Sequence, residues 1–445
     1  MEIFDTIIIG SGATGVTLLH ELKKRNVICL EAHAMPGGCA GYFMREGRPL
    51  NAGATTLSGI AFDGPLKIFL DRHELSVKLT KKDPGLIVHT KRGILRRFSN
   101  NEDWIKEQEQ YFPECNVRDL WTELHALNKL AWNLTRASAL WPPRSMRDLS
   151  KLAFNDTTKK LRALPLLLQS FEKVFLKGDY PEDYRQMLDE LLMISTQSLA
   201  KDVPALIGIM GLCYLEDTWY PEGGMKKFWT DMTAPVKDRI RYRVKVEKIT
   251  QEGGGFRVST SKGFYFAKTV ISTIPVWESE KIAQGAFGEV PHETEGQGAL
   301  TAYFLYDGGE IEAYHQIHAQ ITGASAHSVF ASASEGTLTV STHIRLPFER
   351  QTELWEKEFT ELVSQTFPQL VNLRLNGVGD PKTFHRFTGR ESVGGLPHTL
   401  RRNFLTYPKH ATKWKQFYQS GDTTFPGQGI VGVMQGAMNL AQRIS

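Results

Sequence analysis

Hydrophobic and polar positions near the N-terminus follow the order strand, turn, helix, strand. Residues 3–9 form an apolar run with only two polar interruptions, which predicts a buried strand. Apolar residues at helical spacing from Val16 to Leu22 predict a helix, and a second apolar run over residues 27–30 predicts another strand. Strands that alternate with helices in this way are typical of an α/β fold with a parallel sheet.

The turn between the first strand and the helix carries glycines in GxGxxG spacing. Gly10 allows a tight turn, Gly12 lets a pyrophosphate approach the backbone, and Gly15 lets the helix pack closely on the strand. Glu31 lies about 20 residues further on, where its carboxylate can accept hydrogen bonds from a ribose diol. The sequence therefore predicts a dinucleotide site, which NAD and FAD both fit.

The middle of the chain, residues 99–218, reads as mostly helical. Residues 141–177 carry five more basic than acidic side chains, against an excess of four in the whole chain. Basic flanks around an apolar stripe suit a helix that lies at a membrane surface. A domain helix with a solvated basic face explains the same pattern. The predicted stripe has 3,4,3,4 spacing and consists of Leu161, Leu164, Leu168, Phe171 and Phe175.

Two stretches in the second half of the chain predict β structure. Strict alternation over residues 242–249, followed by two glycine turns, predicts a meander that returns to a buried strand at residues 269–275. Four apolar runs over residues 299–346 predict a second sheet, followed by a helix. His315 and His318 are three apart on a predicted strand, so they face opposite sides and no metal site is expected.

Composition limits the class of protein. A chain of 445 residues with 41% hydrophobic and 23% charged residues is globular and long enough for two domains. A net charge of +4 is too small to argue for nucleic acid. Four scattered cysteines without a CxxC pair predict reduced thiols in a cytosolic protein. No signal peptide precedes the first strand, and the longest apolar run, residues 205–215, is too short to span a bilayer.

The chain ends with a second glycine-rich turn, residues 421–433, which leads into a predicted final helix. Asp422 offers a carboxylate to a sugar-alcohol hydroxyl, and the helix start offers N–H groups and a positive dipole end to an anion. A reduced flavin is such an anion, with its charge near N1 and O2. A simple helix cap explains the Asp but not four glycines within twelve residues.

Four stretches taken together resemble the phytoene desaturase-like family of FAD-dependent oxidoreductases. They are Gly10 to Gly15 with Glu31, residues 36–38, residues 220–224 and residues 421–429. The family includes carotenoid desaturases, carotenoid cis–trans isomerases and retinol saturases. The similarity runs through nearly the whole chain in order and is weak over residues 99–210. Residues 37–43 are most similar to the branch that acts on C40 polyenes.

The resemblance implies an α/β fold with a Rossmann-type FAD-binding domain built from discontinuous segments. That domain would comprise residues 1–61, 219–276 and 415–445. An α+β substrate domain with a mixed or antiparallel sheet would comprise residues 62–98 and 277–414. Residues 99–218 would form a helical cap and a candidate membrane-contact region. The expected location is the cytoplasm, with peripheral attachment to the inner face of the membrane.

The resemblance also implies roles for individual residues. Gly38 would lie near the flavin, Val246 near the adenine, Asp422 on the ribityl chain, and Gly429 with Ile430 at the flavin N1/O2 edge. Cys39 stands where many relatives carry Arg, which weakens the transfer of an amine-oxidase mechanism. The implied FAD-binding residues are Gly10, Ser11, Gly12, Ala13, Thr14, Gly15, Glu31, Ala32, Gly37, Gly38, Cys39, Val246, Gly421, Asp422, Gly429, Ile430 and Val431.

The expected substrate is a hydrophobic polyene or related lipid, from which flavin N5 takes a hydride so that a double bond forms. A redox-neutral cis–trans isomerase that uses reduced flavin, and a retinol-saturase-like reductase, are the alternatives. An amine oxidase or a flavin-binding protein without turnover is less expected. No second GxGxxG for a nicotinamide and no nucleic-acid partner are expected. Arg390, Glu391 and His398 flank a Gly-Gly-x-Pro segment and are the catalytic candidates, unless that loop is only structural.

Overall fold

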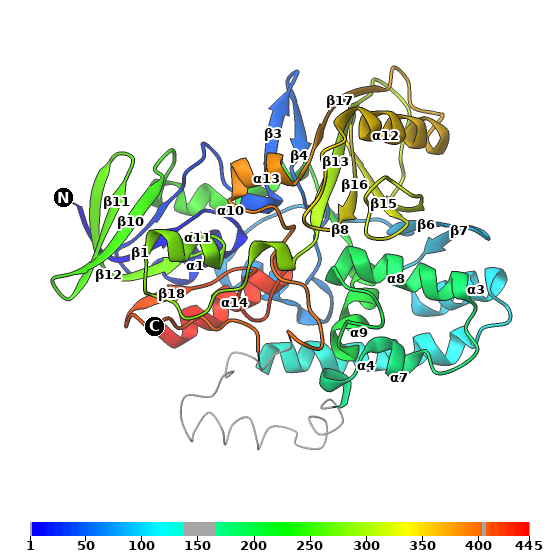
Figure 1. The fold of residues 1–445 in the computed structure, drawn as a ribbon, viewed down its shortest axis with the longest axis horizontal. Coiled ribbons are helices and arrows are strands. Elements are labelled where there is room, and N and C mark those ends of the chain that lie inside the picture. The colour runs from blue at the N-terminus through cyan, green and yellow to red at the C-terminus, as the bar shows by residue number, and fades with distance from the viewer. Residues whose placement is uncertain (1, 138–164, 403–405, 445) are drawn as a thin grey trace.

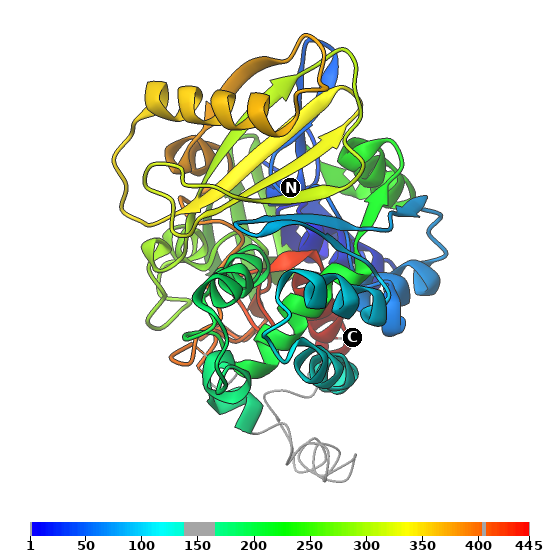
Figure 2. The ribbon, with the colours of Figure 1, turned by 90° about the vertical axis from the view of Figure 1, so that its right-hand side faces the viewer.

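A computed structural model describes residues 2–137, 165–402 and 406–444. Figure 1 shows three regions: a sheet with α1 and α14, a second sheet under α12, and a group of helices beside α4. Turned by 90°, α12 (Thr352–Thr366) lies on the outer side of the second sheet, and the helical group lies on the opposite side of the molecule (Figure 2).

The first sheet has the strand order β10-β11-β12-β1-β2-β9, with β18 beside β12. Its central strand β1 (Glu2–Ile9) runs parallel to both neighbours, and the last four residues of β1 are buried. Helices α1 (Ala13–Glu21) and α14 (Gly429–Ile444) pack against each other. The other strands are β2 (Val27–Leu30), β9 (Ile240–Arg241), β10 (Val246–Glu252), β11 (Gly255–Thr260), β12 (Gly263–Ser272) and β18 (Phe417–Gln419).

The predicted meander is present, but its first strand begins later than the alternation predicts. Strand β10 begins at Val246, because Tyr242 and Arg243 form a turn in which Arg243 has φ = 58°. The N–H of Val244 then donates to the carbonyl of Glu31 at 2.8 Å. The third meander strand and the buried strand predicted after it are one continuous strand, β12.

The second sheet has the order β17-β13-β16-β15-β14-β6-β7 and is mixed, as predicted. Only β14 and β6 pair in parallel, and the other neighbours are antiparallel. The side chain of His315 contacts Phe367 and His89, whereas His318 contacts Glu190, so the two histidines diverge as expected. The strands are β6 (Leu86–Thr90), β7 (Gly93–Arg97), β13 (Gly298–Leu305), β14 (Tyr314–His318), β15 (Ser328–Ser334), β16 (Thr337–Ile344) and β17 (Arg374–Gly379).

The helical region has its own core, which contains Trp104 and Trp121. The apolar run at residues 205–215 forms the largely buried helix α9 up to Cys213 and then enters a short 3-10 helix. Within the described parts of the chain, no helix is long and apolar enough to cross a membrane. The helices are α3 (Asn101–Tyr111), α4 (Val117–Ala137), α7 (Phe171–Phe175), α8 (Glu182–Thr196) and α9 (Ala205–Cys213).

The prediction of one helical stripe over residues 161–175 is wrong in its second half. Ser170 caps the start of α7 with its side chain, so a new helix begins there. Leu168 is 49% exposed, whereas Phe171 and Phe175 are buried in the helical core. Leu161, Leu164 and most of the basic stretch over residues 141–177 lie outside the described residues.

A hairpin joins the first region to the second sheet. It consists of β3 (Tyr42–Arg45) and β4 (Arg48–Asn51) and interrupts the extended loop that the small residues on either side predict. Arg48 donates to the carbonyl oxygens of Tyr306 at 2.7 Å and Gly336 at 3.0 Å. The hairpin projects towards β13 and β17 (Figure 1). The α/β fold class is confirmed, and the domain boundaries stay a prediction.

Candidate cofactor and active site

The start of α1 is held by close backbone packing. A Cβ added at Gly15 would lie 1.9 Å from the carbonyl oxygen of Gly10, so no other residue fits there without movement. The N–H of Gly37 donates to the Ser11 carbonyl at 3.0 Å, which brings the next glycine pair against the turn. A Cβ at Gly12 would lie 3.8 Å from the Cα of Gly38. The result is a backbone cradle that a ligand can approach closely.

Glu31 lies beside this cradle. Its Oε2 accepts hydrogen bonds from the N–H of Ser11 at 2.7 Å and from the Ser11 hydroxyl at 2.8 Å. Its Oε1 accepts from the N–H of His33 at 2.8 Å. Ala32 next to it is exposed, and Val246 is buried in the core of the first sheet. The predicted ribose acid is therefore oriented by the glycine turn itself.

Two distant segments, residues 37–39 and the loop 390–398, meet at the C-terminal glycine turn, residues 421–429. Arg390 and Asp422 form an ion pair through Nη1 and Oδ2, and both side chains are largely buried. Burial lowers the pKa of Arg390, but the nearby Asp422, Cys39 and Glu278 together outweigh it and raise the pKa above its usual range. Burial raises the pKa of the nearby Cys39 thiol. The structure thus brings Arg390 to Asp422, a pairing that the sequence did not predict.

His398 lies under the turn that precedes α14. A Cβ at Gly427 would lie 2.5 Å from its Nε2, and its ring stacks on Tyr407 with 5.1 Å between centroids. Burial lowers the pKa of His398 to about 4, so the imidazole is neutral at pH 7. Glu391 is half-buried and makes no hydrogen bond or ion pair to the described part of the chain. Of the three catalytic candidates, Arg390 and His398 contact the turn that precedes α14.

The first turn of α14 is open. A Cβ at Gly429 would meet no atom within 4 Å, and the turn carries no acidic side chain. No carboxylate of this first turn therefore competes with a ligand for the backbone N–H groups at the helix start. Ile430 and Val431 are half-buried in the same turn. A Cβ at Gly421 would lie 3.9 Å from Thr14 Oγ1, so the two glycine segments lie side by side.

Buried polar atoms at this turn fit the flavin half of an FAD molecule. Arg390 Nε and Gln428 Oε1 are buried and have no hydrogen-bond partner among the described residues. A buried donor or acceptor without a partner costs about 1–3 kcal/mol, so such atoms mark places where water or a ligand binds. With the glycine cradle at one end and a free helix start at the other, the residues present suit FAD.

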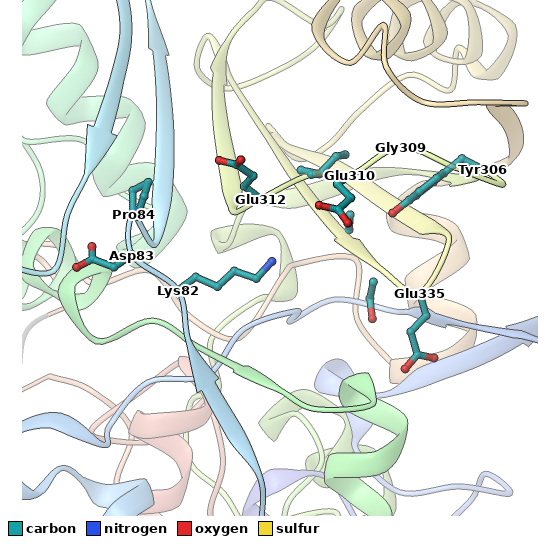
Figure 3. Close-up of a pocket in the computed structure, with 11 residues that line it drawn as sticks. Lys82, Asp83, Pro84, Tyr306, Gly309, Glu310, Glu312 and Glu335 are labelled. Atoms are coloured by element: carbon teal, nitrogen blue, oxygen red, sulfur yellow. The ribbon is translucent and has the colours of Figure 1, made fainter.

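One pocket lies away from this site. It has a volume of about 610 Å³ and lies at the edge of the second sheet. Figure 3 shows Lys82 extending into it from one side, with Glu310 and Glu312 on another. None of the predicted site residues lines it. Its charged lining does not suit an apolar substrate chain.

Sequence reasoning missed one structural anchor of the site, Asp217. Its carboxylate accepts from the backbone N–H groups of Gly59, Ile60 and Ala61 at 2.6–2.9 Å. A Cβ at Gly59 would lie 3.1 Å from Val431, so this loop borders the first turn of α14. The partners lie more than 150 residues apart in the chain, and no local motif indicates them.

Known proteins match this chain over its whole length. Prolycopene isomerase 2 of an Oncidium hybrid cultivar is 25% identical over 503 residues, which cover 100% of this chain and 84% of that protein. The prolycopene isomerase of Arabidopsis thaliana is 24% identical, with 100% of this chain and 83% of that protein covered. Both relatives are chloroplastic proteins.

Solved structures share the fold at low identity. A wild-type putrescine oxidase bound to putrescine has a TM-score of 0.65 at 15% identity, with 99% of each chain covered. A CLA-producing fatty acid isomerase from P. acnes has a TM-score of 0.62 at 13% identity, with 99% of this chain and 98% of that chain covered. The family model described as flavin containing amine oxidoreductase matches residues 13–445. The chain therefore belongs to this family and is an FAD-dependent enzyme.

Proposed function

We propose that this enzyme isomerises a double bond of a carotenoid-like polyene without net oxidation. Relatives named prolycopene isomerases, aligned over the whole chain, support this substrate class. The observation that carries the choice of reaction is the state of the titratable groups at the α14 turn. Arg390 is paired with Asp422, and His398 is neutral.

The residues that would hold FAD are the glycine cradle and Glu31 at one end, and Asp422 with the first turn of α14 at the other. Bound FAD supplies reversible exchange of electrons or hydride with a carbon–carbon double bond. The chain must hold the polyene in place by shape, because an apolar substrate offers few polar handles.

Proton balance separates the two reactions that the sequence left open. Desaturation removes a hydride and a proton, so it needs a base near the substrate. Arg390 stays charged, the pKa of the Cys39 thiol is raised, and His398 is a weak base because its pKa is about 4. Isomerisation returns every atom to the product and needs no net proton acceptor. Among these candidates only Glu391 can serve a desaturase as base.

Product mass tests the proposal directly. The purified enzyme is incubated with a poly-cis polyene in two parallel samples, one with oxidised FAD and one with reduced FAD in the absence of oxygen. The extracted products are separated by chromatography and their masses are measured by mass spectrometry. An isomerase gives a product of unchanged mass and altered retention. A product lighter by two hydrogens means desaturation, a heavier product means reduction, and either result would falsify the isomerase proposal.

Glu391→Gln adds a second test. Under the isomerase proposal the variant keeps turnover within about twofold of the parent, since loss of general-base catalysis would cost about 10²–10⁴-fold. Flavin content measured by absorbance is the control. A large loss of turnover with normal flavin content contradicts a proton-neutral reaction and points back to desaturation.

Contact with a membrane surface follows from the substrate class, because a long polyene is dissolved in the bilayer. The helical region, residues 99–218, which contains the basic stretch of residues 141–177, is our candidate for this contact, on the cytoplasmic side of the membrane. Sedimentation of the enzyme with anionic and with neutral vesicles tests it. Binding that is stronger to anionic vesicles and weakened by salt is expected for a basic surface. Absence of binding to both vesicle types contradicts the proposal.

A further inference from the structure

The buried side chain of Gln197 and the half-buried side chain of Gln428 lie together at the N-terminal end of α14. A Cβ added at Gly394 would lie 3.3 Å from Gln197 Nε2 and 3.9 Å from Gln428 Oε1. Gln197 comes from the end of α8 in the helical region, and Gln428 directly precedes α14. Gln428 belongs to the C-terminal glycine motif, residues 421–429, whereas Gln197 lies outside every glycine motif that predicts FAD binding. A segment of the helical region therefore reaches the cofactor turn.

The orientation of the Gln197 amide is fixed by its neighbour. Its Nε2 donates to the carbonyl oxygen of Val393, which can only accept. Its Oε1 therefore points away from Val393. This oxygen is buried and has no partner within the described residues, and the same holds for Gln428 Oε1. Both atoms are acceptors that lack a donor.

The backbone of Gln197 is also held in an uncommon conformation. It has φ = 57°, a region that non-glycine residues adopt at a cost of about 1 kcal/mol or more. Ser198 next to it donates through Oγ to the carbonyl of His398 at 2.9 Å. Two consecutive residues thus bind the loop 393–398, and this anchoring holds the side chain of Gln197 in position.

A single unpartnered amide oxygen is not informative, since Gln316 and Gln435 have one as well. Two of them beside an open helix start are different, because this helix start is suited to the anionic N1/O2 edge of a reduced flavin. In the flavin ring the carbonyl C2=O2 lies between N1 and N3. The N–H at N3 is therefore the ring donor next to that edge.

We propose that Gln197 and Gln428 form an acceptor site for the N3–H group of the flavin. Through Gln197, the helical region then takes part in cofactor binding and closes the pyrimidine side of the ring. The inference rests on FAD as the cofactor and on its orientation at α14, and it is independent of the reaction proposed above. Failure of the isomerase proposal would leave it unchanged.

The experiment compares FAD with FAD that carries a methyl group at N3, which cannot donate. Both are titrated into the apoprotein, and the dissociation constant is measured from the change in flavin fluorescence. The parent protein is expected to bind N3-methyl-FAD about tenfold more weakly than FAD, the value of one hydrogen bond. Gln197→Leu keeps the side-chain volume but removes the acceptor. It should bind FAD about tenfold more weakly and discriminate less between the two cofactors.

Gln197→Gly guards against a folding defect, because glycine adopts a positive φ without strain. The Gln197→Gly variant should no longer bind FAD more tightly than N3-methyl-FAD, while its unfolding midpoint is unchanged or raised. Gln316→Leu is the matched control: a buried glutamine that donates through Nε2 to Glu190 and lies in the second sheet. It should discriminate between the cofactors as the parent does.

Three results would overturn the proposal. The first is equal binding of both cofactors by the parent protein, which would mean that water occupies the acceptor site. The second is undiminished discrimination in Gln197→Leu and Gln197→Gly. The third is a Gln197→Leu variant with unchanged affinity for FAD but a raised KM for the polyene, which would assign Gln197 to the substrate.

Discussion

The two glycine-rich helix starts, at α1 and at α14, are built in different ways. The start of α1 is held by backbone atoms that are near in sequence, with Gly15 packed on the carbonyl of Gly10. The start of α14 is open at Gly429, and side chains from distant segments, such as Arg390 and Gln197, surround it. The first start is therefore a closely packed backbone cradle, built mostly from residues that are near in sequence. The second is assembled by the tertiary fold and can be varied residue by residue.

Gly15→Ala gives the largest expected effect. Its Cβ would lie 1.9 Å from Gly10 O, a backbone atom that cannot yield easily. We expect the free energy of unfolding to fall by more than about 3 kcal/mol, measured by urea denaturation. Gly178→Ala is the control, since a Cβ there meets nothing closer than 3.8 Å. Equal stability of the two variants would mean that α1 is not held by backbone packing.

Arg390→Met tests the side-chain construction of the second start. It leaves the Asp422 carboxylate, whose side chain is 14% exposed, without its cation. Removing one partner of a buried ion pair costs about 3 kcal/mol. The double variant Arg390→Met, Asp422→Leu should regain part of that stability but bind FAD weakly, as judged by flavin content after purification. If the single and double variants are equally stable, the ion pair does not hold this turn.

Acid should weaken the second start, because His398 is buried and neutral beneath Gly427. Its pKa is about 4 in the folded protein and 6.5 in the unfolded chain, so the unfolded state binds the proton first as the pH falls. Stability from this group is complete above pH 6.5 and is lost towards pH 4. The loss amounts to about 2 kcal/mol at pH 5, which His398→Phe should abolish. Urea denaturation at pH 5 and 7.5 measures it.

His343→Phe is the matched control for this pH dependence. His343 is buried in the second sheet, packs on Phe330 and also has a pKa of about 4. The His343→Phe variant should lose less stability in acid than the parent, by about as much as the His398→Phe variant does. Only His398→Phe should also reduce the release of FAD between pH 6.5 and 5, followed by flavin fluorescence. Equal effects of both variants on FAD release would contradict a specific role for His398 at the α14 turn.

The sequence predicts the features that depend on neighbouring residues and misses those that depend on contacts between distant segments. The β1–α1–β2 unit, the meander and the second sheet were predicted correctly, because periodicity and glycine turns act over a few residues. The break at Ser170 and the hairpin after residue 41 were missed, since packing against distant segments decides them. The Arg390–Asp422 pair, the Asp217 anchor and Gln197 join residues 32, about 157 and about 196 positions apart. No local pattern encodes such pairs.

Gly429→Ala has the smallest expected effect and separates the two starts most directly. Like Gly15 it begins a glycine-rich helix, but a Cβ there meets no atom within 4 Å, so only its φ of 80° opposes alanine. Strain of that kind costs about 1 kcal/mol, well below the cost of the clash at Gly15. The variant should fold, with an unfolding midpoint slightly lower than that of the parent. Its affinity for FAD should still fall, because the added methyl group occupies the open space beside the helix N-terminus. A Gly429→Ala protein that is as unstable as Gly15→Ala would mean that both starts are locally packed, and the distinction between them would be wrong.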